Sequence, residues 1–231
     1  MKFKIIISVL ALMILTLGIQ TPSYATAYLR LDDGATTVTI IDNGGFDNNA
    51  LLGVVGYSGT IGIWLVNVTT GITKPVTGTE LAPYMDVITG NVSTTGPSIG
   101  GMMTISFSDQ GFGPLPIDSY FQGDFGGTTG GSVIYKAYLD AANTPFGTNT
   151  FLFATSPQGT GAFSGTIASA GVGAPLYSLT QQVIITHASG TKVTSGDFSL
   201  IAVPEPATLI LLGSGLAGLW LFGRRKLKGK I

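Results

Sequence analysis

The chain has 231 residues, a net charge of −1, one histidine and no cysteine, so disulfides and zinc sites built on paired histidines are excluded. Seven of its 11 basic residues lie in the first four or the last eight positions, which leaves residues 28–202 with four basic and eleven acidic side chains. This acidic body argues against nucleic acid or anionic lipid as a partner, because both are bound through basic patches. Its 175 residues are enough to bury one core unaided.

The N-terminus has the pattern of a secretory signal peptide. Lys2 and Lys4 precede an apolar stretch at residues 5–19, and Ala25-Thr26-Ala27 forms an A-x-A cleavage signature. We expect residues 1–27 to be removed by a cut after Ala27. A cut after Ala25 is the second choice, because Ser23-Tyr24-Ala25 also fits a small-x-small pattern. An uncleaved N-terminal anchor is the alternative.

The body, residues 28–202, has a hydrophobic period of two, which predicts β-strands. Alternating or short apolar segments occur at 37–42, 103–108, 133–135, 151–153 and 183–185. Residues 61–68 are apolar on both faces, which favours one central strand with Trp64 in the core. Asp-Gly, Asn-Gly-Gly and Gly-Gly turns separate these segments. We therefore predict a single all-β domain, an antiparallel β-sandwich of the Greek-key or jelly-roll type.

No residue pattern in the body identifies a reaction, and we expect no catalytic residues and no resident cofactor. His187 stands at the end of an apolar alternation, where a structural histidine, hydrogen-bonded or solvent-facing, is expected. A secreted hydrolase would need a pair of carboxylates in a cleft. The sequence does not show whether any two of the eleven acids meet.

Two weaker patterns indicate binding. Asp42 and Asp47 lie in the segment D-N-G-G-F-D-N-N, which gathers oxygen ligands of the kind that calcium requires. The same residue types are ordinary turn formers. Tyr120, Phe121 and Phe125 lie close to acidic residues, as in a sugar-stacking platform. Aromatic side chains also fill the cores of sandwiches.

The C-terminal tail, residues 203–231, has three parts in a fixed order. The segment at 203–208 contains Val203, Pro204, Glu205 and Pro206, and the two prolines hold it out of both sheet and helix interiors. Residues 207–222 carry no charge and form about 24 Å of helix, a minimal membrane span compared with the roughly 20 residues usually needed. The basic tail at 224–230 then begins with Arg224, Arg225 and Lys226. Basic residues stay on the cytoplasmic side, so the body lies outside the inner membrane.

This arrangement resembles the PEP-CTERM sorting signal of Gram-negative bacteria. The matching residues are those at 203–208, Gly213-Ser214-Gly215 within the apolar stretch, and Arg224-Arg225-Lys226. The resemblance implies recognition by an exosortase, an integral membrane transpeptidase-like enzyme that cuts near the motif. The protein would then pass to the cell surface or the extracellular polysaccharide matrix. A permanent single-span anchor is the alternative.

Together these patterns predict an exported, non-enzymatic protein with a structural or adhesive role at the cell surface or in the extracellular matrix. Its expected partners are an exosortase-type enzyme, the inner membrane during sorting, and exopolysaccharide. The first alternative is a carbohydrate-binding module for the cell's own exopolysaccharide. The second is a secreted hydrolase.

Overall fold

The computed structural model describes residues 26–94, 100–203 and 214–215. Residues 26–94 and 100–203 contain strands, turns and loops but no helix, so the predicted all-β, antiparallel class is confirmed. The predicted signal peptide up to Ala25 and the predicted membrane span lie outside the described residues, apart from Ser214 and Gly215 of the span.

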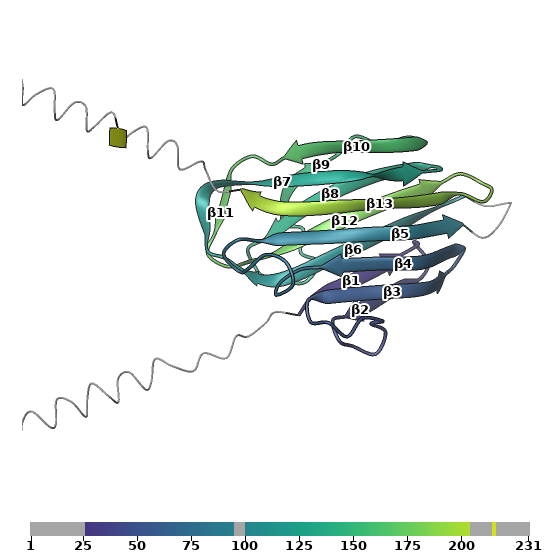
Figure 1. Ribbon diagram of the computed structural model, residues 1–231, viewed down its shortest axis with the longest axis horizontal. Coiled ribbons are helices and arrows are strands. Elements are labelled where there is room, and N and C mark those ends of the chain that lie inside the picture. The colour runs from purple at the N-terminus through teal and green to yellow at the C-terminus, as the bar shows by residue number, and fades with distance from the viewer. Residues whose placement is uncertain (1–25, 95–99, 204–213, 216–231) are drawn as a thin grey trace, which may run out of the picture.

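The strands form two antiparallel sheets (Figure 1). The first sheet has the order β2 (Thr37–Ile41), β1 (Tyr28–Asp32), β6 (Gly101–Phe112), β12 (Tyr177–His187), β8 (Ser132–Asp140) and β9 (Thr150–Ala154). The second has the order β10 (Gly161–Ala168), β7 (Leu115–Thr129), β13 (Val193–Val203), β5 (Tyr84–Thr94), β4 (Trp64–Ile72) and β3 (Val54–Ile61). The short strand β11 (Val172–Ala174) pairs with β7.

The strand order is that of a jelly roll. β12 lies between β6 and β8, and β13 lies between β5 and β7, so the last two strands of the body are inserted into sheets built from earlier strands. The hairpins β1–β2 and β3–β4 extend the two sheets beside β6 and β5. Most neighbouring strands are therefore far apart in sequence, as Greek-key connections require.

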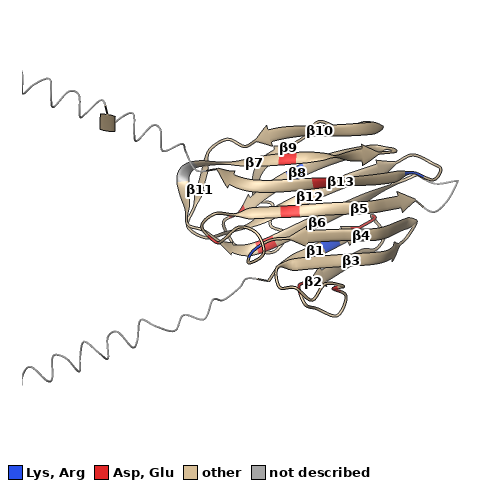
Figure 2. Ribbon diagram, in the orientation of Figure 1, with Lys and Arg blue, Asp and Glu red and all other residues tan. Residues whose placement is uncertain are grey.

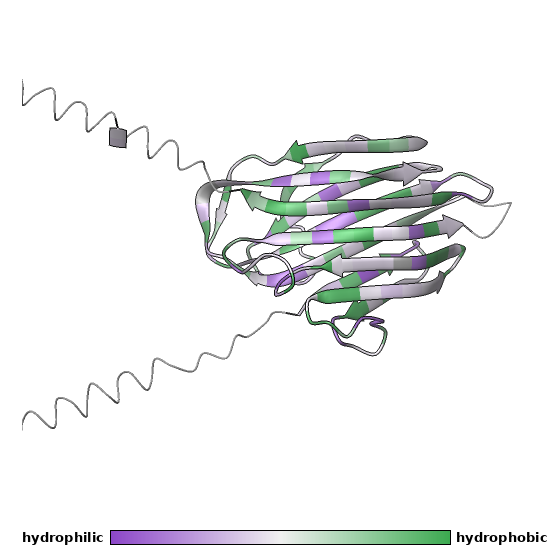
Figure 3. Cartoon of the chain, viewed as in Figure 1, coloured by the Kyte–Doolittle hydropathy of each residue, from purple (hydrophilic) through white to green (hydrophobic). Residues whose placement is uncertain are grey.

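One hydrophobic core lies between the two sheets, and both sheets contribute to it. Tyr135 of β8 and Phe153 of β9 approach Phe198 of β13, with ring centroids 5.1 and 6.1 Å away. The Gln181 side chain of β12 donates a hydrogen bond to the Phe198 carbonyl at 2.7 Å. Figure 3 shows hydrophobic and hydrophilic bands following one another along the strands. This alternation places one face of each strand in the core and the other outside.

One strand assignment made from the sequence is wrong. Residues 61–68 form the turn and part of a hairpin, because β3 ends at Ile61 and β4 begins at Trp64. Gly62 has a φ of +54°, a backbone conformation that glycine adopts without steric cost. The uninterrupted apolar sequence concealed this two-residue turn. Trp64 is nevertheless buried in the core, as predicted.

The described chain begins and ends at the same end of the sandwich, which we call the exit end. Tyr28 of β1 pairs with Ser108 near the end of β6, and Val203 of β13 pairs with Tyr120 near the start of β7. The short connection between β6 and β7 joins these two regions. The loops of the exit end are 42–53, 73–83, 113–114, 141–149, 169–171 and 175–176. The opposite end, with loops 33–36, 62–63, 130–131, 155–160 and 188–192, is called the far end.

Candidate functional site at the exit end

The last strand of the body leads directly into the tail. β13 pairs with a neighbour on each side, β5 and β7, and ends at Val203. The Ala202 amide donates a hydrogen bond to the Pro83 carbonyl at 3.1 Å. The next residue in the sequence is Pro204, which has no amide hydrogen for a sheet ladder. The fold therefore extends to the first residue of the predicted sorting motif.

Only part of the predicted sorting signal falls within the described residues. Val203 closes β13, whereas Pro204, Glu205 and Pro206 lie outside them. The basic residues Arg224, Arg225 and Lys226 also lie outside. Within the described residues, no helix has the length and apolar composition of a membrane span.

The N-terminal end of the described chain is part of the fold. Ala27 is 1% exposed and belongs to the core, and its carbonyl accepts a hydrogen bond from the Asp42 amide at 3.0 Å. A cut after Ala25 retains this residue in the mature protein, whereas a cut after Ala27 removes it. Both cleavage bonds remain predictions.

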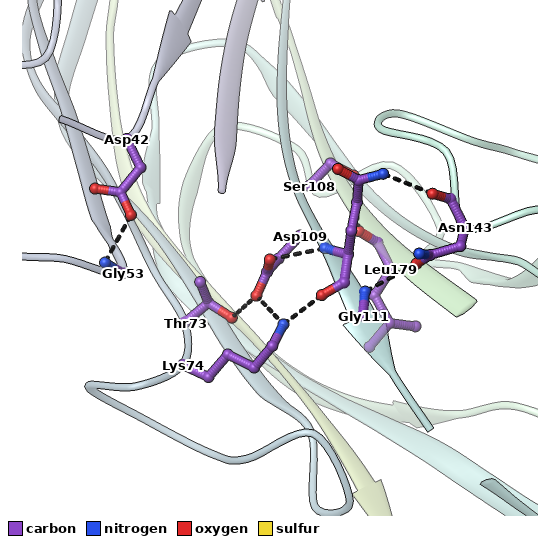
Figure 4. Close-up of polar contacts among 10 residues, drawn as sticks. Asp42, Gly53, Thr73, Lys74, Ser108, Asp109, Gly111, Asn143 and Leu179 are labelled. Carbon is purple, nitrogen blue, oxygen red and sulfur yellow. Dashed lines mark hydrogen bonds and ion pairs between the residues drawn. The ribbon is translucent and has the colours of Figure 1, made fainter. Parts of the chain in front are cut away.

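A buried ion pair, which no sequence pattern indicates, connects two segments of the exit end (Figure 4). Lys74 Nζ lies 2.6 Å from Asp109 Oδ2, and the two side chains are 4% and 0% exposed. The Thr73 hydroxyl donates to the same carboxylate oxygen at 2.8 Å. The Lys74 ammonium also donates to the Gln110 carbonyl and lies 3.7 Å from the centroid of the Phe112 ring. The pair fixes the start of loop 73–83 against the end of β6.

Burial and pairing act in opposite directions on these two groups. Burial lowers the pKa of Lys74, and the nearby Asp109 carboxylate opposes this shift. Burial raises the pKa of Asp109, while Lys74 and the hydrogen bonds from Thr73 and Gln110 oppose the shift. Both side chains are enclosed, and each is held by the other and by the neighbouring hydrogen bonds.

The same network of hydrogen bonds extends from the end of β6 to a second loop, 141–149. The Gln110 side chain donates to the Asn143 carbonyl at 2.6 Å, and the Gly111 amide donates to Asn143 Oδ1 at 2.8 Å (Figure 4). The Ser108 hydroxyl donates to the Leu179 carbonyl at 3.0 Å and accepts from the Phe146 amide at 3.0 Å. Loops 73–83 and 141–149 are thus both attached to the end of β6.

The calcium candidates are engaged in their own loop. Asp42 Oδ2 accepts from the Gly53 amide at 2.8 Å, and Asp47 Oδ1 accepts from the amides of Asn49 and Gly56 at 3.0 and 2.9 Å. Burial raises the pKa of Asp42, and the Gly53 hydrogen bond opposes that shift. Within the described ranges, no three His, Cys, Asp or Glu side chains are grouped to hold a metal ion. Calcium at Asp42 and Asp47 stays a prediction.

Two of the three aromatic residues considered for sugar stacking, Phe121 and Phe125, contribute to the core, whereas Tyr120 is half-buried and does not belong to it. Phe121 is fully buried, and Phe125 stacks on Tyr135 with ring centroids 5.4 Å apart. Asp124, on the opposite face of β7, accepts hydrogen bonds from Thr166 and Gln122 at 2.6 and 3.0 Å. A platform that uses Phe121 and Phe125 is therefore wrong, because alternation along β7 turns both rings inward.

His187 has the structural role expected for it, at the far end. The residue is 1% exposed, and the centroid of its ring lies 4.8 Å from that of the Trp64 ring. Its Nε2 shares a 2.8 Å hydrogen bond with Thr194 Oγ1. Burial lowers its pKa, and the positive charge of Lys192 lowers it further. His187 is therefore part of the packed interior of the far end.

The outer face of the second sheet has a shallow hollow of about 420 Å³ over β5, β13 and β7. Its lining includes Gly90, Gly127, Thr128, Ser195, Gly196 and Asp197. Ser199 lies two residues after Asp197 on β13. It is paired with Asp86 on β5 and with Asp124 on β7. Figure 2 shows the three acidic bands side by side on β7, β13 and β5. Burial, and then the charge of Asp197, raises the pKa of Asp86. One carboxylate, that of Asp197, lines the hollow itself.

Comparison with protein families identifies the tail. Residues 202–226 match the family model described as the PEP-CTERM protein-sorting motif. The chain carries a PEP-CTERM sorting motif. This motif implies an exported protein that is sorted at the membrane and processed by an exosortase. Its first two matched residues, Ala202 and Val203, are the last two residues of β13.

The solved structures compared with this chain resemble it only weakly, with sequence identities of 12–13% and TM-scores of 0.33 or less. The carbohydrate-binding module TmCBM61, solved with β-1,4-galactotriose, is 12% identical, with a TM-score of 0.33 over 61% of this chain and 88% of that one. TmCBM27, studied for mannan recognition, is 12% identical, with a TM-score of 0.26 over 62% and 90%. The infectious bursal disease virus Gx strain structure is 13% identical, with a TM-score of 0.31 over 81% and 54%. No curated protein matches the chain. Function is therefore inferred from the sorting motif and not from these similarities.

Proposed function

We propose that this is a non-catalytic protein of the cell surface or extracellular matrix with a structural or adhesive role. An exosortase recognises Val203, Pro204, Glu205 and Pro206 and separates the body from the apolar segment at 207–222. The mature protein leaves the inner membrane after this step. Its body consists of the jelly-roll domain, which ends at Val203.

The observation that supports the sorting step of this proposal is the continuity of β13 with the motif. The matched residues begin inside a strand with a partner on each side, so the folded body has no spacer before the motif. An extended segment held by a rigid domain is a good substrate for a protease-like enzyme, because less conformational entropy is lost when it binds. The body thus holds Val203, the first residue of the motif, in a fixed place at the end of β13.

The chemistry of the body supports a non-catalytic role. The pair Lys74–Asp109 and His187 are enclosed and engaged in structural bonds. The hollow on the second sheet is lined by the single carboxylate of Asp197, whereas glycoside hydrolysis uses two. These features favour binding or scaffolding over a hydrolase.

Replacement of Pro204-Glu205-Pro206 by alanines tests the sorting step. The variant keeps the apolar stretch and the basic stop, so it should still insert but remain full-length in the inner membrane. Wild-type chain should lose the tail and appear at the surface or in the medium. Immunoblots of fractionated cells measure both size and location. Equal size and location for the two proteins would mean that the motif is a linker before a permanent anchor.

The structure suggests where an epitope for that experiment belongs. Gln158 forms a β-bridge with Val133, with backbone hydrogen bonds of 2.8 and 3.0 Å. Gly159 and Thr160 follow in an exposed part of the same far-end loop. An insertion between Gly159 and Thr160 therefore leaves the bridge intact and stays away from the motif.

The burial of Ala27 supports a signal-peptide cut after Ala25. A mature chain starting at Thr26 keeps Ala27 in the core and keeps the hydrogen bond between its carbonyl and the Asp42 amide. N-terminal sequencing of the exported protein should then begin at Thr26. A start at Tyr28 would mean that the fold tolerates the loss of both interactions.

Binding of exopolysaccharide is a second candidate function, and the hollow on the second sheet favours it. Hydroxyl groups of Thr128 and Ser195, the Asp197 carboxylate and exposed glycine backbone line this hollow. Such groups can hydrogen-bond sugar hydroxyls. Cosedimentation with purified matrix polysaccharide should weaken in Asp197→Asn and be unchanged in Asp32→Asn, a change in the far-end half of β1. Equal binding by both variants would remove the hollow from consideration.

A further inference from the structure

Large apolar side chains are exposed on the loops of the exit end. Phe46 is 73% exposed, Leu51 56% and Leu81 68%, and Leu52, Val76 and Leu176 are exposed as well. These six side chains lie on three loops, 42–53, 73–83 and 175–176. The described loops of the far end, by contrast, carry none of the large exposed apolar side chains.

These three loops lie together around the two places where the chain leaves the fold. The Thr73 amide donates to the Gly53 carbonyl at 2.8 Å, which joins loops 42–53 and 73–83. The Gly113 amide donates to the Glu80 carbonyl at 2.9 Å, and the space beside Gly113 is occupied by the Pro175 carbonyl. Loop 42–53 also contacts Ala27 through Asp42, and loop 73–83 contacts Ala202 through Pro83.

The sequence limits how far this end can lie from a membrane. Three residues, 204–206, separate the end of β13 from the apolar stretch that begins at Ala207. Fully extended, they reach about 10 Å, similar to the depth of about 5–10 Å to which interfacial apolar groups are buried. The predicted leader joins the same end at Thr26. The tail therefore holds the exit end close to the membrane during sorting, and the leader does so as well until it is removed.

The charges of this end specify the kind of lipid surface. Asp42, Asp47 and Glu80 lie on its loops, whereas Lys74 is enclosed by its pairing with Asp109 and the Arg30 guanidinium lies over the Phe146 ring. The loops thus have apolar tips and a negative charge. Anionic headgroups would repel these carboxylates, whereas zwitterionic headgroups would not.

We propose that the exit end is a membrane-contact surface, in which Phe46, Leu51, Val76, Leu81 and their neighbours insert into a zwitterionic lipid interface while the precursor is tethered. This proposal rests on the membrane-associated sorting of the precursor. The contact orients the body over the membrane and keeps the motif at the lipid surface. There a membrane-embedded enzyme can reach it.

Because the chain has no cysteine, one introduced cysteine gives a unique label. The full-length precursor is reconstituted into phosphatidylcholine vesicles with an environment-sensitive fluorophore at Leu81→Cys or Phe46→Cys. Matched controls are Met102→Cys and Val193→Cys, which are 52% and 43% exposed near the far end. Lipids that carry a nitroxide quencher should quench the exit-end labels several-fold more strongly than the control labels. Phosphatidylglycerol in the vesicles should reduce that difference.

Four results would overturn the proposal. Equal quenching at both ends would mean that the body does not lie on the lipid. Quenching that appears only when exosortase is present would assign the surface to the enzyme, and quenching that depends on the protein-to-lipid ratio would assign it to a second copy. If the precursor fails to float with the vesicles, it is not tethered to the membrane. Both this proposal and the proposed sorting would then be wrong. Flotation with equal quenching leaves the sorting proposal intact.

Discussion

The two ends of the sandwich are held together by different interactions. At the exit end, a buried ion pair between Lys74 and Asp109 is surrounded by further hydrogen bonds. At the far end, hydroxyl groups carry the contacts: Thr194 Oγ1 lies 2.7 Å from Thr129 Oγ1 and 2.8 Å from His187 Nε2. The Thr94 hydroxyl donates to the Gly190 carbonyl at 2.9 Å. Charge is buried at one end, and neutral groups are paired at the other.

This difference has consequences for how each end responds to change. A buried charge that loses its partner is far more costly than a hydroxyl that loses a hydrogen bond. The exit end combines this sensitive interior with apolar loop tips that face outward. Changes in its interior should therefore affect stability strongly, whereas its exposed loop tips are available for contacts with other molecules.

Removal of one partner of the ion pair should have the largest effect. Asp109→Ala leaves the Lys74 ammonium buried without a counter-charge, and we expect the free energy of unfolding to fall by about 3–5 kcal/mol. Urea unfolding of a protein spanning residues 26–203 measures this. The double variant Lys74→Met/Asp109→Leu should recover most of the loss. If the double variant is no better than Asp109→Ala, the loss comes from packing and not from the unpaired charge.

The corresponding change at the far end should cost less. Thr194→Val removes the hydroxyl shared by Thr129 and His187, and about 1–3 kcal/mol of stability should be lost. Thr194→Ser keeps the hydroxyl and serves as the control in the same urea titration. A Thr194→Val variant as unstable as Asp109→Ala would erase the distinction between the two ends.

The far end should also respond to pH through His187. Burial lowers the pKa of this ring, so the unfolded chain binds a proton more readily than the folded chain below its ordinary value of 6.5. Stability should therefore fall as the pH drops below about 6.5, by at most about 1.4 kcal/mol per pH unit. The slope should be smaller in His187→Gln. Identical slopes in the two proteins would show that other groups titrate.

The smallest effect is expected at the apolar loop tips. Leu81→Ser and Phe46→Ser alter side chains that are mostly in water, and each should change the free energy of unfolding by no more than about 0.5 kcal/mol. Thermal melts beside wild type check this. A large loss of stability in either variant would mean that these side chains serve the fold, which would weaken the case for a membrane contact.

Local sequence patterns predicted the strands better than their partners. The alternation in 37–42 and 103–108 correctly placed strands that became β2 and part of β6. The apolar run at 61–68 gave one strand where there are parts of two, because a turn of Gly62 and Ile63 carries no polar signal. The jelly-roll order depends on pairs such as β5 with β13, about a hundred residues apart. The hydrophobic periodicity of a segment does not show which distant strand it pairs with.

The site shows the same limit. The tail could be recognised from sequence because its motif, apolar stretch and basic stop are contiguous. Lys74 and Asp109 are 35 positions apart, and nothing in their local sequence marks them as a pair. The direction of Phe121 was predictable in principle, since it lies on the same face of β7 as Phe125 and Gly123. Without the register of the sheet, however, neither face could be assigned to the core.

The position of β13 also determines how the protein responds to mechanical force. A pull on the tail acts along this strand, which is bonded to β5 on one side and to β7 on the other. Hydrogen bonds in antiparallel ladders run perpendicular to the strands, so such a pull shears many of them together and does not unzip them one by one. The strand that leads into the sorting motif is thereby held on both sides against such a pull.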